Sequence, residues 1–284
     1  MTTQPRENSV WLITGCSTGF GREIALAALA RGYRVAVTAR NPEAVGDIVE
    51  RFPEHAVAVP LDVTDRAQIA AAVDITRDRL GVPDVLVNNA GYGYMAAVEE
   101  GEDHEVRRLF DTNYFGAVDL VKALLPGMRE QGRGHIINIS SMTGLVTNPP
   151  NVYYSCTKYA LEALTEGLSK ELEPFGIRVT AIEPGAFRTD WASRSMRETA
   201  TPLSVYDETV GARRELIKAT AEVLPGDPRR AADAVVMLSE LEAPPLHLLL
   251  GRDVLSAFRS KLEGLTASIN QWESVTKDVG FPGK

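Results

Sequence analysis

Tyr154 and Lys158 are the first residues in this chain whose types and spacing could do chemistry. A helix is expected from Val152 to Glu173, and a spacing of four residues places both side chains on one helical face. The phenol of a tyrosine has an ordinary pKa of about 10, and a nearby ammonium favours the phenolate. The pair is therefore a candidate general acid–base. Such pairs also arise by chance in helices whose side chains only pack. The residues around the pair therefore decide whether a catalytic role is supported.

Polar or glycine-rich segments follow four of the expected strands. They are the glycine loop after Val10–Ile13, N-N-A-G at 88–91 after Asp84–Val87, Ser140 and Ser141 after His135–Ile139, and E-P-G at 183–185 after Ile177–Ile182. Parallel strands end at one edge of an open sheet, and ligands bind there. We therefore expect these segments to face one crevice, where a serine could meet Tyr154.

The loop T-G-C-S-T-G-F-G at 14–21 lies between an expected strand and a helix expected over Phe20–Arg31. Glycines let a backbone turn tightly and approach a pyrophosphate, and the helix start offers free N–H groups. The spacing G-x-x-x-G-x-G differs from the common G-x-G-x-x-G fingerprint, so a purely structural turn is the alternative.

The end of the second expected strand, Arg34–Thr38, bears on the choice of dinucleotide. No carboxylate stands there to hold the ribose hydroxyl of NAD, whereas Arg40 suits the 2′-phosphate of NADP. The alternative is that Arg40 is a solvated loop residue. Asp62 follows the third expected strand, Ala56–Pro60, and could bond the adenine edge.

Short apolar runs alternate with helical patterns along most of the chain, which predicts βαβ units. The further helices are expected over Asp65–Leu80, Asp103–Arg129 and Pro228–Leu241, and a last strand over His247–Leu250. The fold class is therefore α/β, a single doubly wound parallel sheet with helices on both faces. We expect one domain over residues 1–284, with a core over about 9–250, a helical substrate lid over about 186–228, and a tail over 252–284. The tail has one amphipathic pattern (Val254, Phe258, Leu262, Leu265), after which we expect it to fray.

Composition excludes several classes of protein. The 284 residues carry a net charge of −8 with a pI near 5.2, which argues against nucleic acid or an anionic membrane as partner. No apolar run is long enough to span a membrane, and the polar N-terminus does not resemble a signal peptide. The two cysteines lie outside any C-x-x-C pattern and are expected to be free thiols in the cytoplasm. The four histidines show no ligand spacing, so no metal site is expected.

Taken together, these motifs resemble the short-chain dehydrogenase/reductase family. The matching features are T-G-x-x-x-G-x-G at 14–21, N-N-A-G at 88–91, Asn113 in T-N-Y-F-G, Ser141 thirteen residues before Tyr154 in Y-x-x-x-K, and P-G-x-x-x-T at 184–189. The similarity covers roughly residues 9–250. It implies a Rossmann fold and an enzyme that interconverts a ketone or aldehyde and an alcohol, such as a carbonyl reductase.

The resemblance also implies a role for each matched residue. Tyr154 would exchange a proton with the substrate oxygen, and Ser141 would polarise it. Lys158 would hold the nicotinamide ribose and lower the pKa of Tyr154. Asn113 would support a water that links Lys158 to solvent, although a capped or kinked helix would also explain this residue. Tyr153 and Tyr159 are expected to pack.

The resemblance implies a nicotinamide dinucleotide as cofactor, and Arg40 favours NADP(H), with NAD(H) as the alternative. Many relatives that prefer NADP carry a basic residue where Thr18 stands, so the preference depends mainly on Arg40. The residues expected to bind the cofactor are Gly15, Ser17, Thr18, Gly19, Phe20, Gly21, Arg40, Asp62, Val63, Asn89, Ala90, Gly91, Tyr154, Lys158, Pro184, Gly185 and Thr189. Relatives suggest a homodimer or homotetramer, and the PPLHLLLG ending suggests a bulky apolar substrate.

Three other readings compete with this one. Ser155 to Lys158 matches S-x-x-K formally, but the chain has neither the S-D-N nor the K-T-G of serine acyl-enzymes. A non-catalytic NADP(H)-binding redox sensor would not need Ser141, Tyr154 and Lys158 together. A lyase or epimerase could use the same fold.

Overall fold

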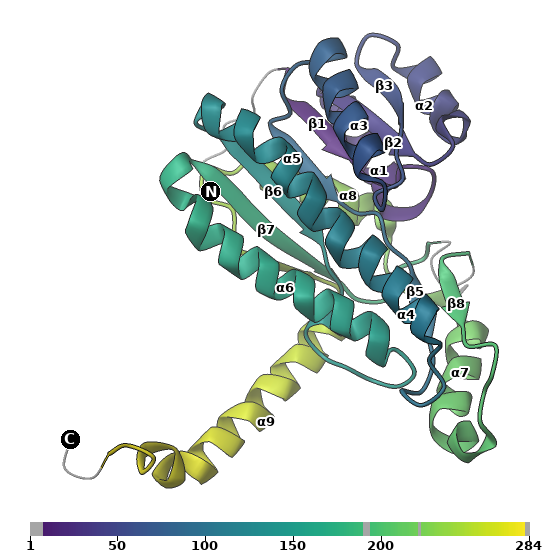
Figure 1. Cartoon of the computed structure of the whole chain (residues 1–284), viewed down its shortest axis with the longest axis vertical. Coiled ribbons are helices and arrows are strands. Elements are labelled where there is room, and N and C mark those ends of the chain that lie inside the picture. The colour runs from purple at the N-terminus through teal and green to yellow at the C-terminus, as the bar shows by residue number, and fades with distance from the viewer. Residues whose placement is uncertain (1–7, 190–193, 221–222, 282–284) are drawn as a thin grey trace.

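The computed structural model describes residues 8–189, 194–220 and 223–281, and seven parallel strands form its main sheet. The strand order is β3-β2-β1-β4-β6-β7-β9 (Figure 1). The strands are β1 (Val10–Ile13), β2 (Arg34–Ala39), β3 (Ala56–Pro60), β4 (Val85–Asn88), β6 (Gly134–Ile139), β7 (Ile177–Pro184) and β9 (His247–Leu250). The order reverses between β1 and β4, so the doubly wound parallel sheet predicted from the sequence is confirmed.

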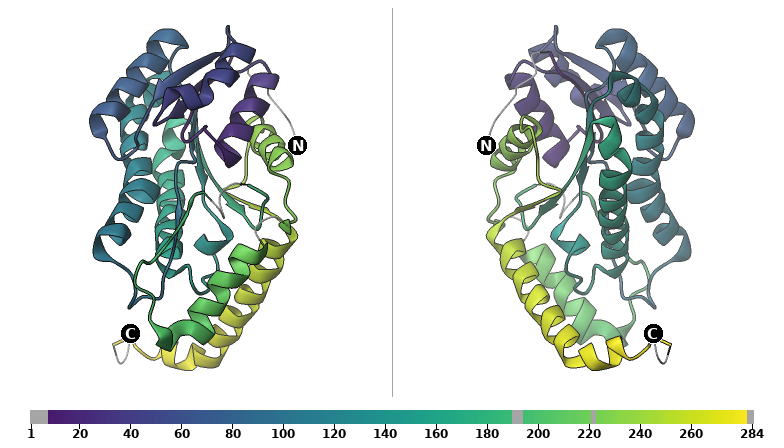
Figure 2. Two further views of the ribbon diagram at one scale, coloured as in Figure 1. Left: turned by 90° about the vertical axis from the view of Figure 1, so that its right-hand side faces the viewer. Right: turned by 90° about the vertical axis from the view of Figure 1, so that its left-hand side faces the viewer.

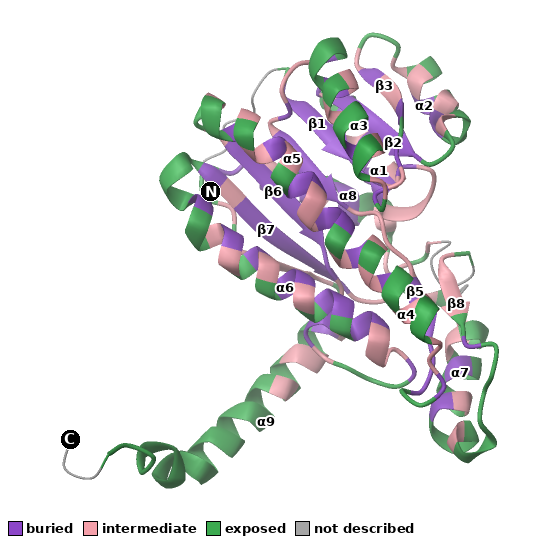
Figure 3. Ribbon diagram, in the orientation of Figure 1, coloured by how far each residue is buried: buried purple, intermediate pink, exposed green. Residues whose placement is uncertain are grey.

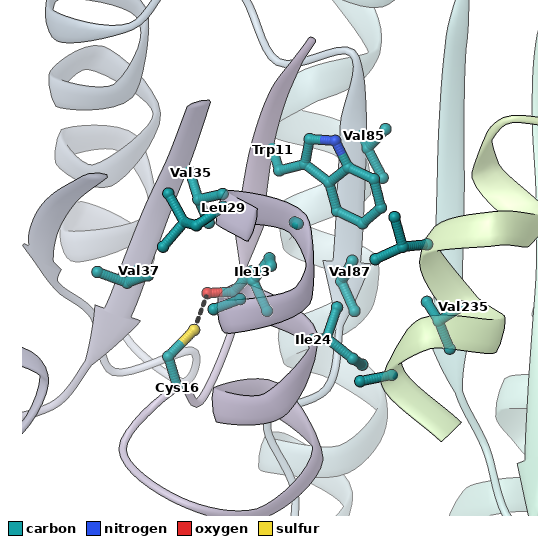
Figure 4. Packing of buried hydrophobic residues seen from close by; sticks show 14 of the residues in the cluster. Trp11, Ile13, Cys16, Ile24, Leu29, Val35, Val37, Val85, Val87 and Val235 are labelled. Carbon is teal, nitrogen blue, oxygen red and sulfur yellow. Dashed lines mark hydrogen bonds between the residues drawn. The ribbon is translucent and has the colours of Figure 1, made fainter. Parts of the chain in front are cut away.

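Helices cover both faces of this sheet, which explains why its strands carry apolar residues on both faces (Figures 2 and 3). Trp11 and Ile13 of β1 pack with Ile24 and Val235 of the helices on one face, as Figure 4 shows. Leu12 belongs to the cluster on the other face. The first face carries α1 (Gly19–Ala30) and α8 (Pro228–Ser239), and the second carries α3 (Arg66–Arg79), α5 (Gly116–Gln131) and α6 (Val152–Leu172).

One helix predicted as continuous, Asp103–Arg129, is interrupted. The structure has α4 (Asp103–Phe110), then a π-helical turn over Asp111–Phe115, then α5. Asn113 lies in this turn, where its side chain accepts from the Tyr92 N–H at 3.0 Å and donates to the Tyr92 carbonyl at 2.9 Å. These bonds hold the turn against the segment after β4, and π turns inside helices often mark functional positions.

The expected lid contains a strand as well as a helix. β8 (Met196–Glu198) pairs with β5 (Gly93–Met95), and α7 (Ala212–Thr220) follows (Figure 1). Residues 190–193 and 221–222 of the expected lid lie outside the described residues. The smaller elements are η1 (Pro42–Val45), α2 (Gly46–Arg51), η3 (Met142–Gly144), η4 (Glu173–Phe175), η5 (Ser204–Tyr206) and η6 (Asp207–Gly211).

A buried ion pair fastens this lid to the chain beside β5. Arg214 of α7 donates to Glu100 at 2.7 Å, and the Glu100 side chain is fully buried. Glu100 also accepts from the backbone N–H groups of Ala97 at 2.8 Å and Leu203 at 2.9 Å. Together these bonds compensate the cost of burying the carboxylate.

The tail departs from expectation, because it does not fray after Leu265. A single helix, α9 (Arg252–Lys277), continues for twelve residues beyond that position. Among the described residues, no helix is both long enough and apolar enough to cross a membrane.

Glu100→Gln should loosen the lid, because it leaves Arg214 buried without a charged partner. Breaking a buried ion pair costs roughly 3–5 kcal/mol. We expect limited proteolysis to cut within 196–220 faster than in the parent protein. Glu99→Gln is the matched control, since Glu99 is exposed and bonds only Tyr206 among the described residues. Equal cleavage rates in the two variants would contradict the role of the pair.

Candidate active site

The Thr14 hydroxyl joins β1 to β4 at the point where the strand order reverses. It donates to the Val87 carbonyl at 3.2 Å and accepts from the backbone N–H groups of Asn89 and Ala90, both at 2.8 Å. The Asn89 amide donates in turn to the Thr14 carbonyl at 2.8 Å. The N-N-A-G segment and the glycine loop are therefore one hydrogen-bonded unit.

The glycines of this loop are required by the backbone and by close approach. Gly15 and Gly19 adopt φ values of +71° and +60°, which favour glycine. A Cβ on Gly21 would lie 2.4 Å from both the Asn89 amide nitrogen and the Gly15 carbonyl oxygen. Helix α1 begins at Gly19, and its N-cap Thr18 makes no capping bond through its side chain. The first N–H groups of α1 are thus open to an anionic ligand, as the phosphates of a dinucleotide require.

The residues expected around the rest of the cofactor lie along the same edge. Thr189 lies above the loop, with its Cβ 3.8 Å from where a Cβ on Gly19 would stand. Phe20 stacks edge-on against Phe187 with ring centres 5.1 Å apart. Pro184 ends β7, and the next residue, Gly185, donates its N–H to Leu250 at 2.9 Å. Ser17 is partly exposed in the loop, and Gly91 packs beside the Asn113 amide.

The adenosine end of the expected site is formed by the turns after β2 and β3. Arg40 directly follows β2, is exposed, and makes no hydrogen bond or ion pair with any described residue. Asp62 accepts from the backbone N–H and the hydroxyl of Thr64, at 3.0 and 2.7 Å. Val63 is buried against Gly116 of α5. Among these three residues, Arg40 therefore leaves an exposed guanidinium at the end of β2.

Tyr154 meets Ser141 rather than Ser140. The Tyr154 side chain is 5% exposed, and its hydroxyl bonds the side chains of Ser141 and Thr143. Ser141 is the N-cap of η3, and its Oγ also accepts from the Thr143 N–H at 3.1 Å. Ser140 lies beside Gly144 instead, next to the carboxylate of Glu162. Sequence reasoning missed Thr143, for which the sequence holds no separate signal.

The expected lowering of the Tyr154 pKa by Lys158 is not found in this structure. Burial raises the pKa of Tyr154, and the bonds from Ser141 and Thr143 only partly oppose it. The Lys158 Nζ donates to the Ile139 carbonyl at 2.8 Å and lies 5.6 Å from the centre of the Tyr154 ring. Burial lowers the pKa of Lys158 itself to about 8, against the attraction of Glu162. Burial therefore affects the pKa of Tyr154 more strongly than any attraction between its phenolate and the Lys158 ammonium.

Asn113 and Lys158 both line a small internal cavity of about 10 Å³. That volume is near the lower limit for one water molecule, roughly 10–15 Å³. Polar groups also surround it, because Thr14, Asn88 and Thr112 contribute to its wall. Asn113 donates to Thr157 at 3.2 Å as well, which fixes its amide beside the cavity.

A cluster of acid groups behind Lys158 was missed. His247 Nδ1 lies 2.7 Å from a carboxylate oxygen of Glu183 and 3.5 Å from one of Glu162. Ligand atoms of the three residues lie within 4.8 Å of one another and could hold a cation, a grouping that histidine spacing in the sequence does not reveal. Burial raises the pKa of Glu162 to about 7 and that of Glu183 to about 8. The signal in the sequence that could have pointed to this cluster was Glu162, which lies one helical turn after Lys158.

Tyr153 and Tyr159, the other two tyrosines near the start of α6, have packing contacts, as expected. Tyr153 donates to the Val98 carbonyl at 2.6 Å and packs near Tyr94, with ring centres 6.2 Å apart. Tyr159 donates to the Leu145 carbonyl at 2.6 Å, on another side of the helix. Both cysteines are free; Cys16 is buried and bonds the Ile13 carbonyl (Figure 4), whereas Cys156 is exposed.

Comparison with known proteins finds dehydrogenases and oxidoreductases that resemble this chain. Residues 9–200 match the family model described as short chain dehydrogenase. The chain is 37% identical to the oxidoreductase BOA17 of Botryotinia fuckeliana over 94% of its own length and 97% of that protein.

Two solved structures extend the comparison. A short-chain dehydrogenase from Streptomyces avermitilis has a TM-score of 0.91 and 42% identity, over 97% of this chain and 100% of that one. A gluconate 5-dehydrogenase from Burkholderia cenocepacia, solved in complex with NADP and tartrate, has a TM-score of 0.73 and 25% identity, over 89% of this chain and 97% of that one.

The raised pKa of Glu183 predicts a loss of stability with rising pH. The fold binds this proton more tightly than the unfolded chain does. The stabilising contribution is therefore full below about pH 4.5 and is lost as the pH passes through about 8. Glu183→Gln removes this titration, so its Tm relative to the parent protein should rise between pH 5 and about pH 8 and then level off. The exposed Glu171→Gln on α6 is the control. A constant Tm difference across that range would refute the assignment.

Proposed function

The chain belongs to the short-chain dehydrogenase family and is an oxidoreductase that acts on CH–OH groups with NAD(P); we propose that it interconverts a ketone or aldehyde and an alcohol with NADP(H) as the preferred cofactor. The observation that carries this proposal is the buried Tyr154 hydroxyl, bonded to Ser141 at the carboxyl edge of the sheet. When bound, the nicotinamide supplies the hydride chemistry. The remaining steps belong to the side chains of this chain.

Tyr154 acts as the general acid or base. In reduction its hydroxyl donates a proton to the carbonyl oxygen, and in oxidation the phenolate takes one from the alcohol. Because burial raises its pKa, Tyr154 is protonated at neutral pH, which is the form that reduction requires. Ser141 shares a hydrogen bond with this hydroxyl, so it can donate to the same substrate oxygen and stabilise the developing charge.

Lys158 and Asn113 restore the proton. The Lys158 ammonium lies over the Tyr154 ring, close enough to favour the phenolate as it forms. The cavity shared with Asn113 suits one water, which would connect Lys158 to the interior polar groups. Lys158 would also hold the nicotinamide ribose, because its side chain crosses from α6 to the end of β6.

The preference for NADP(H) depends on Arg40. An exposed guanidinium at the end of β2, without a partner among the described residues, is suited to a bidentate phosphate contact. The remaining cofactor contacts are proposed as expected from the sequence, from the glycine loop to Thr189.

Apolar side chains near Tyr154 support a bulky apolar substrate. Tyr94, Ala96 and Leu109 are buried against Tyr154, and Tyr153 is packed against the same cluster. We also propose that the enzyme is cytoplasmic, since its thiols are free, and that it is a homodimer or homotetramer forming one domain per chain.

Tyr154→Phe should lower kcat by about 10²–10⁴-fold, the usual contribution of a positioned acid–base group. The variant keeps the ring and therefore the packing, so NADPH should bind with nearly unchanged Kd. Turnover is followed as NADPH absorbance with a panel of ketones and aldehydes.

Tyr153→Phe is the matched control for Tyr154→Phe, because it removes the same atom one position away. We expect it to keep most of the activity. If Tyr154→Phe retains the activity of the parent protein, or if both variants lose it equally, the acid–base role is wrong.

Arg40→Ala should weaken NADPH far more than NADH. A charge-assisted hydrogen bond contributes about 1.5–3 kcal/mol, so the KM for NADPH should rise roughly tenfold or more. The KM for NADH serves as the internal control and should stay within about twofold. Equal shifts for the two cofactors would show that Arg40 does not read the 2′-phosphate.

A further inference from the structure

Helix α9 carries an apolar stripe that, beyond Lys261, no described residue of the same chain covers. Large apolar residues recur at alternating spacings of three and four along it: Leu255, Phe258, Leu262, Leu265, Ile269 and Trp272. Leu262, Leu265, Ile269 and Trp272 are 46%, 48%, 66% and 56% exposed. A contiguous exposed stripe of this kind marks an interaction site in a water-soluble fold.

The pattern of the stripe indicates what covers it. Spacings of three and four repeat every seven residues, which is the seam of a coiled coil. The stripe is also narrow, since the outward positions Ser260, Ala267 and Ser274 are small or polar. A helix that packs on a globular core or lies in a bilayer surface needs a wider apolar face. The width of the stripe is therefore suited to packing against one other helix.

The position of α9 leaves room for that helix. Only its first turns touch the body, where Lys261 bonds the Leu145 carbonyl and the Tyr159 hydroxyl. Beyond Lys261 every described residue of α9 is exposed. Figure 1 shows the helix projecting from the sheet edge, and Figure 3 shows it exposed along most of its length. Twenty-six residues span about 39 Å, at 1.5 Å per residue.

We propose that α9 pairs with α9 of a second copy of this chain, antiparallel, about a two-fold axis that crosses the apolar seam midway between Leu265 and Ile269. In that register Leu265 packs against Ile269 of the second copy, and Leu262 packs against Trp272. Each contact occurs twice, as a two-fold interface requires.

Charge complementarity selects this orientation. In the antiparallel register Arg259 flanks the seam opposite Glu273 of the second copy, at both ends of the interface. In a parallel pair Arg259 would instead face Val254, and Glu273 would face Ser268, so no opposite charges would meet. Glu273 also pairs with Lys277 of its own helix at 2.6 Å, and exposed carboxylates accept more than one donor.

A membrane surface fits α9 less well. Interfacial helices carry mainly Lys and Arg on the polar face. The polar residues of α9 include four basic and three acidic side chains: Arg252, Arg259, Lys261, Lys277, Asp253, Glu263 and Glu273. A helix surface that carries both positive and negative side chains is suited to a protein partner that carries both as well.

The first test is the number of subunits in the full-length enzyme, measured by light scattering after gel filtration. Leu265→Glu places a charge in the seam near the two-fold axis and should halve the number of subunits. Ala267→Glu, on the outward face, should leave it unchanged. Neither residue contacts the body of the protein, so Tm should hold in both. A monomeric parent protein, or an unchanged number of subunits in Leu265→Glu, would overturn the proposal.

The second test addresses orientation. In a Cys156→Ser background, Thr266→Cys should be cross-linked to its own copy by a short bis-maleimide, because residue 266 flanks the seam at the axis. Ser260→Cys, on the outward face, should give little cross-linked dimer. Equal dimer yields from the two variants would overturn the antiparallel register. A monomer that binds phosphatidylglycerol vesicles would overturn the second copy as partner.

Discussion

The Thr14 hydroxyl holds together the two strands between which the sheet reverses its order. Its three hydrogen bonds reach Val87, Asn89 and Ala90, so β1 cannot shift against β4 without losing all of them. The glycine loop that follows Thr14 is in turn packed so closely on Asn89 that a single methyl at Gly21 would overlap it. The proposed binding of the cofactor phosphates at the start of α1 would therefore depend on this junction.

Burial governs the chemistry at the other end of the same edge. Tyr154, Lys158 and Glu183 all lie out of solvent, and burial shifts the pKa of each toward its uncharged form. In the proposed mechanism, a negative charge that develops on the substrate would be stabilised by the hydroxyl of Ser141 and by the ammonium of Lys158. Polar groups in a low dielectric act more strongly there than they would in water.

The sheet and the edge that carries the candidate site could be predicted from the sequence, because buried parallel strands are rich in apolar residues and here end in recognisable polar segments. The Glu183–His247 contact could not, since it depends on β7 pairing with β9, 64 residues later. The π turn at Asn113 has no periodicity of its own. The tail was misread because its apolar residues beyond Leu265 are few, although Ile269 and Trp272 continue the same spacing.

The base of α9 and the active site share one support. Lys261 bonds the carbonyl of Leu145, which lies just beyond η3, and the Tyr159 hydroxyl bonds the same carbonyl. Ser141 is the N-cap of η3, and Tyr154 lies on α6 with Tyr159. The loop that carries Ser141 is therefore held between α6 and the first turns of α9. A constraint on α9 therefore acts on the loop that carries Ser141, whereas the glycine loop is held by separate bonds between Thr14 and Asn89.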